Sequence, residues 1–265
     1  MAEITFKLKE GSKIPIEAEA ICPDQLAGKT LKEIGNLPVW KGNKELKLSD
    51  LFEIKGEAGS DSTELVVRVV SETTKIKRIG QGMSAGKLII EGNAGMHLAE
   101  EMQGGEVLVT GDVDDWAFTQ MRGGTALVQG NAGHYLGAAE WGNWQGNTGG
   151  MITVEGNAGN EVGAWLAGGT IEIKGNVGEF LGVHMKKGVI VAHGKVNPRV
   201  GAEMTGGQII LFSEPDRLLS GFEKSDVMVE SVEINGKPLS GPFIKFIGDF
   251  AERKKPKGVI LIRKK

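Results

Sequence analysis

The 265-residue sequence has only one cysteine, Cys22, and so it cannot form an internal disulfide bond. This scarcity is typical of reducing compartments, and we expect a cytoplasmic protein. The sequence also lacks an uncharged run of the roughly 18–20 residues that a membrane span needs, and residues 1–20 contain no signal-peptide core. With a formal net charge of −3, it lacks the basic excess of a nucleic-acid-binding protein. We therefore expect no membrane and no nucleic acid among its partners.

Glycine, by contrast, is abundant, and 30 of the 41 glycines lie between Gly80 and Gly207. The pattern G-x-x-M-x-x-G-x-I-x-V-x-G recurs there seven times, at a spacing of 19 residues with one spacing of 26 that contains a seven-residue insertion. Short regular repeats of this kind indicate a stacked solenoid. The seven units are residues 80–92, 99–111, 118–130, 144–156, 163–175, 182–194 and 201–213.

Within each unit, apolar residues alternate with other residues, which indicates a β-strand with one inward face. A helix is excluded, because each glycine in a helix interior costs about 1 kcal/mol relative to alanine. The sequence therefore predicts an all-β fold: a right-handed parallel β-helix of about seven 19-residue coils from Gly80 to Phe212. One predicted inward column contains Leu88, Val107, Ala126, Ile152, Ile171, Ile190 and Ile209. A second contains Met83, Met102, Met121, Leu166, Met185 and Met204, with Asn147 replacing the methionine of the fourth unit.

The repeat glycines are interpreted as structural corners of the coils. They are Gly86, Gly92, Gly95, Gly105, Gly111, Gly124, Gly130, Gly133, Gly150, Gly156, Gly159, Gly169, Gly175, Gly178, Gly188, Gly194 and Gly207. The alternative, a phosphate-cradling loop at G-N-A-G, is disfavoured because a nucleotide site is built once per domain and this turn occurs in every unit.

Two neighbouring columns carry further predictions about these corners. The column of Gly95, Asp114, Gly133, Gly159, Gly178 and Asn197 is predicted to adopt positive φ, which these residue types tolerate. The column of Asn93, Asp112, Asn131, Asn157, Asn176 and Lys195 is predicted to form a stack of side chains that hydrogen-bond local backbone.

The regions on either side of the repeats are predicted to be small α+β caps that cover the open ends of the solenoid. Residues 1–79 contain strand-like segments at 4–8 and 64–70 and a short helix candidate at 30–34. Residues 213–265 are expected to contain an apolar strand or helix, a basic loop and a closing strand.

Candidates for catalysis or metal binding are few. The four histidines fall in four different columns, so stacking of the coils is not expected to gather them: His97, His134, His184 and His193. The string GDVDDW resembles a calcium loop only superficially, because Asp112 and Asp114 occupy columns where asparagine or glycine stands in other units. No C-x-x-C or H-x-x-x-H motif occurs. We expect no catalytic residue, no metal site and no cofactor in this chain.

Aromatic residues suggest a contact surface. Trp141 and Trp144 lie on the glycine-rich insertion, and Trp116, Tyr135 and Phe180 share one column that is predicted to face outward. Such side chains are typical interface anchors, although the two inserted indoles could instead fold back onto their own coil. The outward residues Ile89, Leu108 and Leu127 form a second apolar strip, which the N-terminal cap could cover instead.

The tandem units with their G-N-A-G corners resemble the C subunit of formylmethanofuran dehydrogenase and, more distantly, the glycine-repeat β-helix at the C-terminus of the glutamate synthase large subunit. The segments PDQLAGKTLKEIGNLPV and FIGDFAERKKPKGVILI resemble the flanks of the dehydrogenase subunit.

The resemblance implies a structural subunit of a cytoplasmic, hetero-oligomeric oxidoreductase complex that reduces CO2 and forms N-formylmethanofuran, the first step of methanogenesis from CO2. It implies that a tungsten- or molybdenum-pterin subunit, a metal-dependent amidohydrolase-like subunit and iron–sulfur subunits carry the chemistry, with a larger electron-transfer assembly as a further partner. The composition rich in lysine, glutamate and isoleucine favours an archaeal source.

Two alternatives to this function stay open. One is the C subunit of a methylotroph formyltransferase/hydrolase complex, a one-carbon enzyme without redox centres. The other is an independent module that binds a nucleotide or sugar at the G-N-A-G corners.

Overall fold

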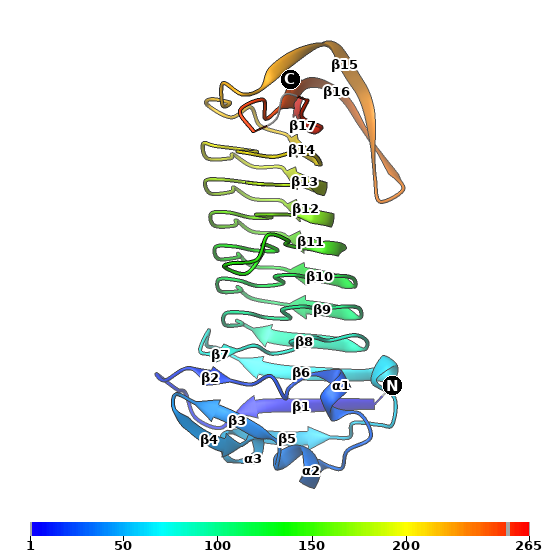
Figure 1. Ribbon diagram of the computed structural model, residues 1–265. Coiled ribbons are helices and arrows are strands. Elements are labelled where there is room, and N and C mark those ends of the chain that lie inside the picture. The colour runs from blue at the N-terminus through cyan, green and yellow to red at the C-terminus, as the bar shows by residue number, and fades with distance from the viewer. Residues whose placement is uncertain (1, 253–254, 265) are drawn as a thin grey trace.

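The protein is described by a computed structural model that covers residues 2–252 and 255–264 (Figure 1). Parallel strands are stacked one above another through the middle of the molecule, with short helices at the N-terminal end and a long hairpin at the C-terminal end. None of the helices in the described residues is long and apolar enough to cross a membrane.

The N-terminal region contains short helices and strands that precede the repeats. Its elements are β1 (Ala2–Leu8), β2 (Ile16–Glu17), α1 (Pro23–Leu26), α2 (Leu31–Gly35), β3 (Pro38–Lys41), β4 (Lys44–Lys47), α3 (Leu48–Leu51), β5 (Phe52–Gly56), the 3-10 helix η1 (Ser62–Glu64), β6 (Leu65–Ser71) and β7 (Ile76–Lys77). The helix predicted around residues 30–34 is confirmed, and Thr30 caps α2 by accepting a hydrogen bond from the Glu33 N–H.

The repeats each contribute one strand, and three further strands follow them. The repeat strands are β8 (Lys87–Gly92), β9 (Glu106–Val109), β10 (Thr125–Val128), β11 (Thr148–Val154), β12 (Ala167–Ile173), β13 (Lys187–Ala192) and β14 (Gln208–Leu211). The C-terminal strands are β15 (Glu223–Ile234), β16 (Lys237–Gly248) and β17 (Gly258–Arg263).

In the described residues, the strands form a thirteen-stranded sheet in the order β15-β16-β17-β14-β13-β12-β11-β10-β9-β8-β6-β1-β5 and a four-stranded sheet. In the large sheet, the consecutive strands β1, β6, β8, β9, β10, β11, β12, β13, β14 and β17 pair with one another in parallel. The prediction of an all-β fold with parallel strands is therefore confirmed. Equivalent residues of successive units are paired, as Ala126 is with Val107 and Ile152. A second row of parallel bridges joins Ala94, Val113, Ala132, Ala158, Val177 and Val196.

The inward columns predicted from the repeat are confirmed. Every residue of the Leu88 and Met83 columns is buried, and the columns merge into one continuous core. Asn147, the exception among the methionines, is also buried, and its side-chain oxygen accepts a hydrogen bond from the Met121 N–H at 2.8 Å. The amide is therefore accommodated because it bonds to backbone of the preceding layer.

The prediction of positive φ for the column of Gly95, Asp114, Gly133, Gly159, Gly178 and Asn197 is wrong, since none of these residues adopts it. Their glycines are needed for close approach instead. A Cβ atom on Gly159 would lie 2.7 Å from His134 Nδ1 and 2.8 Å from the carbonyl carbon of Gly133. Positive φ occurs instead at Gly86 and its equivalents in the other six units, between 79° at Gly86 and 88° at Gly188.

The asparagine column forms a hydrogen-bonded ladder along the stack. The side-chain oxygen of Asn93 accepts a hydrogen bond from the Asp112 N–H at 2.9 Å, and the same bond is repeated up to Asn176, which accepts from the Lys195 N–H at 2.8 Å. Hydrogen bonding to backbone is thus confirmed, but its partner is not the local backbone that was predicted: each side chain accepts from an N–H group of the next layer. Each bond ties two layers that are 19 or 26 residues apart in sequence.

Both ends of the stack continue the main sheet. At the N-terminal end, β6 and β1 add parallel strands and β5 closes the edge in antiparallel orientation. At the other end, β17 pairs with β14 in parallel, which confirms the predicted closing strand. Of the predicted basic loop, residues 253–254 lie outside the described residues.

The hairpin of β15 and β16 is not anticipated by the sequence pattern. It arches away from the C-terminal end and returns along one side of the stack (Figure 1), where Asn235 near its tip contacts Thr170 and Met151. Phe243 of β16 is fully buried against Val191, Ile210 and Leu261, which lie on the outer face of β13, β14 and β17. The hairpin therefore covers the C-terminal half of the sheet's outer face.

We predict that Gly156→Val destabilises the protein by about 3 kcal/mol or prevents folding, because the packed neighbouring layer cannot move away. A Cβ atom at Gly156 would lie 2.5 Å from the Gly130 carbonyl oxygen and 2.6 Å from Asn131 Oδ1. Urea unfolding followed by circular dichroism measures the effect. Gly11→Val is the matched control, since a Cβ there meets nothing within 4 Å. Equal stability of the two variants would contradict the close approach.

Candidate interaction surface

One face of the stack carries aromatic rings that are piled in register with the layers. The ring of Trp116 stacks on Tyr135 with a centroid distance of 4.1 Å and an interplanar angle of 10°, and it lies parallel to His97 on its other side at 6.2 Å. A second pile is formed by Trp165 and His184, at 4.0 Å and 15°. The separations follow the layer spacing of about 4.8 Å, so stacking of equivalent residues produces the piles.

The backbone beneath these rings has an uncommon conformation. Trp116, Tyr135 and Phe180 have φ values of 64°, 61° and 62°, a region that bulky residues rarely occupy. The same column has positive φ from Arg78 to Arg199 in every layer. This conformation belongs to the architecture of the turn, and the packed layers on both sides hold it in place.

The insertion lies over the aromatic piles. Trp141 meets Trp116 edge-on at 6.0 Å, and Trp144 meets Trp165 edge-on at 5.0 Å. Lys186 donates a hydrogen bond to the Trp144 carbonyl oxygen, and its Nζ lies 4.9 Å from the centre of the Trp165 ring. The two inserted indoles therefore do fold back onto the stack, which was one of the two alternatives for them. Even so, Trp141 is 80% exposed and Trp144 is 66% exposed.

The five aromatic candidates consequently differ in their access to a partner. Trp116 is buried at 9% exposure, so the expectation that it forms part of an outward stripe is wrong: the insertion and the neighbouring rings cover it. Tyr135 and Phe180 are half-buried, and the guanidinium of Arg199 lies 4.9 Å from the Phe180 ring centre. Of the five, only the two inserted indoles present most of their surface.

The second apolar strip lies on the outer face of the sheet. Ile89, Leu108 and Leu127 are half-buried, and an open groove of about 310 Å³ runs over Leu108, Leu127 and Met151. The residues that line this groove come from the strands of the stack and none comes from residues 2–79. At Leu108 and Leu127, the alternative that the N-terminal region covers the strip is therefore not seen in the described residues.

A larger cavity of about 430 Å³ opens between the hairpin and the sheet. It is lined by Met151, Val191, Phe212, Ile234, Leu239 and other residues, and one wall carries the His193 ring stacked on Phe212 at 4.3 Å. His193 Nε2 lies 2.8 Å from the Glu172 carboxylate. The cavity is therefore mainly apolar, and its polar lining consists of Glu172, His193, Asn235 and Lys237.

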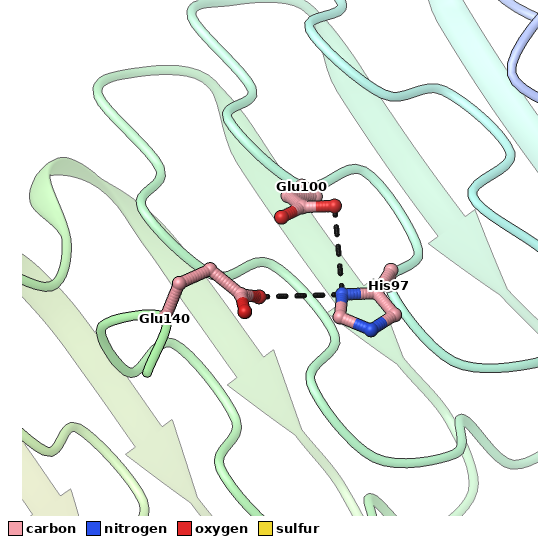
Figure 2. Close-up of side chains that lie close together, drawn as sticks. All are labelled: His97, Glu100 and Glu140. Carbon is pink, nitrogen blue, oxygen red and sulfur yellow. Dashed lines mark ion pairs between the residues drawn. The ribbon is translucent and has the colours of Figure 1, made fainter. Parts of the chain in front are cut away.

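Next to the aromatic piles, three ionisable side chains converge, as Figure 2 shows. His97 Nδ1 lies 3.4 Å from Glu100 Oε2 and 3.3 Å from Glu140 Oε1. His97 Nδ1 is buried and has no hydrogen-bond partner among the residues that the structure describes. The Arg78 guanidinium donates to Glu100 at 2.7 Å, and Thr119 Oγ1 donates to Glu140 at 3.4 Å.

Burial and neighbouring charges act on these two carboxyl groups in different directions. Burial would raise the pKa of Glu100, but the His97 ring and the Arg78 guanidinium outweigh it and hold that pKa below its ordinary value. Burial, and then the negative charge of Glu100, raise the pKa of Glu140. The two carboxyl groups therefore compete for a proton.

The repeat pattern does not predict this cluster, and no metal site is expected from that pattern. The prediction that stacking keeps the four histidines apart is consistent with the structure, but the partners of His97 are carboxylates. Glu100 lies three residues after His97, whereas Glu140 is at the start of the insertion and has no equivalent in other layers. The i, i+3 spacing of His97 and Glu100 was the only signal for the cluster. Asp112 and Asp115 instead accept hydrogen bonds from the N–H groups of Asn131 and His134.

Comparison with known proteins gives relatives of one kind. No family model matches the chain. The C subunit of the molybdenum-containing formylmethanofuran dehydrogenase 1 from Methanosarcina barkeri is 48% identical over 98 residues, which are 37% of this chain and 33% of the relative. The C subunit of the tungsten-containing formylmethanofuran dehydrogenase 2 from Methanothermobacter thermautotrophicus is 40% identical over 98 residues, which are 37% and 36%. The aligned part thus spans about a third of the length of these relatives.

A solved structure matches almost the whole chain. It is the formyltransferase/hydrolase complex (FhcABCD) from Methylorubrum extorquens in complex with methylofuran, of which one chain superposes with a TM-score of 0.85 and 25% identity, covering 98% of this chain and 100% of that chain. The resemblance to the C subunit of formylmethanofuran dehydrogenase is thereby confirmed. The more distant resemblance to glutamate synthase is not supported by these comparisons.

We predict that Trp116→Ala destabilises the isolated chain by about 3 kcal/mol, because it removes a buried indole from between two rings. Trp141→Ala is the matched control and is expected to change stability by less than about 1 kcal/mol, since that side chain is mostly exposed. Both are measured by urea unfolding. A larger loss for Trp141 than for Trp116 would show that the indole on the insertion carries the packing.

Proposed function

We propose that this chain is a structural subunit of a formylmethanofuran dehydrogenase complex, in which it holds catalytic subunits in fixed positions. The observation that carries the role as a subunit of a multi-subunit complex is the match of nearly the whole chain to one chain of a formyltransferase/hydrolase complex. The curated relatives point to the dehydrogenase, because their names place them in the C subunits of molybdenum- or tungsten-containing forms of that enzyme.

In this proposal, CO2 reduction and formation of N-formylmethanofuran take place in partner subunits. The expected partners are a tungsten- or molybdenum-pterin subunit, an amidohydrolase-like subunit and iron–sulfur subunits. In this proposal, the chain supplies no catalytic residue and acts through its shape and its surfaces. Its fold alone does not specify an activity.

A second candidate is a subunit of a formyltransferase/hydrolase complex without redox centres. The superposition with the Methylorubrum extorquens complex favours it. The higher identity to dehydrogenase subunits, although over a shorter segment, favours the first candidate. The third possibility, a nucleotide or sugar at the G-N-A-G corners, has less support, because the asparagine ladder and the closely approaching backbone fill those corners.

We infer that the repeats wind as a right-handed parallel β-helix of about seven coils from residue 80 to 212, with residues 1–79 and 213–265 as its two caps. The in-register parallel pairing of β8 to β14 and the second row of bridges support one coil per 19 residues. The hand is the one expected for parallel crossovers. Stacked coils with a continuous core make a stiff spacer, which suits a scaffold.

Three surfaces are available for partners. They are the exposed indoles of Trp141 and Trp144, the open groove over Leu108 and Leu127, and the outer side of the hairpin, where Val227 is 67% exposed. Exposed aromatic groups are the strongest anchors of the three, because interface hot spots are enriched in tryptophan and tyrosine. We propose that the insertion contacts another subunit.

Purification of the complex from its native source through a tag on this chain tests the proposal. We expect copurifying subunits and stoichiometric tungsten or molybdenum with iron, measured by mass spectrometry and metal analysis. The isolated chain serves as a control and is expected to contain no tungsten and no molybdenum. A complex that lacks both metals but hydrolyses the formyl group would favour the second candidate, and an unaccompanied chain would refute both.

The double variant Trp141→Ser/Trp144→Ser is expected to dissociate from the complex while its repeats stay folded. Each interfacial indole contributes about 2 kcal/mol or more when it acts as a hot spot. Size-exclusion chromatography follows assembly, and circular dichroism follows folding. Trp40→Ser, at a tryptophan that is 42% exposed on β3, is the matched control. An intact complex with the double variant would show that these indoles serve only their own layers.

A further inference from the structure

We propose that His97, Glu100 and Glu140 bind a divalent transition-metal ion, zinc being the best fit, which fastens the insertion to the layers beneath it. Among residues 2–252 and 255–264, these three form the only group of histidine, cysteine and carboxylate side chains arranged closely enough to share an ion. The proposal is independent of which enzyme complex the chain joins.

The distances between the donor atoms fit a tetrahedral ion. Bonds of about 2.0–2.1 Å from zinc to imidazole nitrogen and carboxylate oxygen imply an edge of about 3.3 Å between two ligand atoms. The two edges from His97 Nδ1 measure 3.4 Å to Glu100 and 3.3 Å to Glu140. All three donor atoms lie within 4.8 Å of one another. One ion can therefore contact all three donor atoms if only the two carboxylate side chains shift.

The histidine presents a ring nitrogen to the two carboxylates. Within residues 2–252 and 255–264, the buried His97 Nδ1 makes no hydrogen bond, and it faces both carboxylates (Figure 2). A buried ring nitrogen without a partner costs free energy, which a bond to a metal ion would remove. Stacking against Trp116 fixes the orientation of the ring and so aims the nitrogen at the carboxylates.

The position of Glu100 in the repeat is a separate observation. Its equivalents in later layers are Thr119, Ala138, Ala164, Val183 and Ala202, all of them buried. The Glu100 side chain is only 9% exposed, so a carboxylate takes the place of small or apolar residues. A buried carboxylate is retained where it is paired or where it coordinates a metal. Arg78 supplies one positive charge against two carboxylates, and an ion would compensate the second.

The ligand chemistry selects the kind of ion. Calcium and magnesium prefer six or more oxygen ligands, which this cluster does not supply. One imidazole with two carboxylates is typical of zinc and related transition ions. Thr119 and Arg78 donate hydrogen bonds to the two carboxylates and would orient them as outer partners of the site. The fourth position would hold water or a donor from another subunit.

The bound ion would position the insertion. Glu140 immediately precedes Trp141, which packs edge-on against Trp116, the ring that stacks on His97. A metal bond at Glu140 would restrain the loop that carries the two exposed indoles.

The full-length chain, stripped with a chelator, is titrated with zinc by calorimetry and with cobalt by visible spectroscopy. We expect one ion per chain, cobalt absorption bands of a four-coordinate site, and a zinc-dependent rise of the thermal unfolding midpoint. Glu140→Gln, on the exposed insertion, should fold normally and weaken binding by more than about 100-fold, since even outer-sphere partners are worth 10–100-fold.

His184→Ala is the matched control. His184 Nδ1 lies 3.5 Å from Glu203 and also stacks on a tryptophan, but this pair has no third ligand among the described residues, so binding should be unchanged. Absence of stoichiometric binding by the unaltered chain would overturn the proposal. So would binding that persists in Glu140→Gln, because the ion would then be held elsewhere.

Discussion

The structure depends on one constraint: each residue lies directly above its equivalent in the preceding layer, at the inter-strand spacing of about 4.8 Å. A column must therefore tolerate its own repetition. Branched apolar residues do so inside the core, and glycine does so where backbones approach closely, as at Gly156 beside Gly130 and Asn131. Asparagine does so because its side-chain oxygen satisfies the N–H group of its successor. The glycine and asparagine columns are neighbours, because the space left by the missing glycine side chain is occupied by the asparagine side chain of the adjacent layer.

This constraint also shows which residues the architecture does not explain. A residue that differs in type from the others in its column cannot make the interactions that the column repeats. It therefore needs interaction partners of its own. Asn147 finds one in the backbone of Met121 and is thereby a structural exception. Glu100 breaks a column of small and apolar residues, and its partners are Arg78 and the side chains that converge on His97. The insertion breaks the spacing of the layers, and it alone brings Glu140 and two exposed indoles to this face.

The same logic explains what the sequence could predict. Alternation and spacing suffice for the strands, their parallel pairing and the buried columns, since these follow from repetition. The φ angle at Gly95 was mispredicted, because a glycine kept for close approach looks the same in sequence as one kept for positive φ. The hairpin and the contact of Glu140 with His97 depend on segments outside the repeat, whose positions no period encodes. Even so, the motif GVILI at residues 258–262 repeats the strand pattern and signals the rung that β17 forms.

The outer face of the sheet shows how such a molecule divides its surface. One outward column runs from Ile89 through Leu108 and Leu127, continues with the polar residues Thr153 and Glu172, and ends with Val191, Ile210 and Leu261, as the register of the strands requires. The hairpin buries the last three against Phe243, whereas Leu108 and Leu127 line the open groove. The column thus has two apolar stretches, of which the chain covers one and leaves the other for another molecule. From β6 to β17 the rungs span about 38 Å at the inter-strand spacing. The hairpin reaches back along this length to Met151, which also lines the groove, so a partner in the groove would lie next to the hairpin tip. A stack of paired strands holds both surfaces in fixed positions, which a flexible linker cannot do.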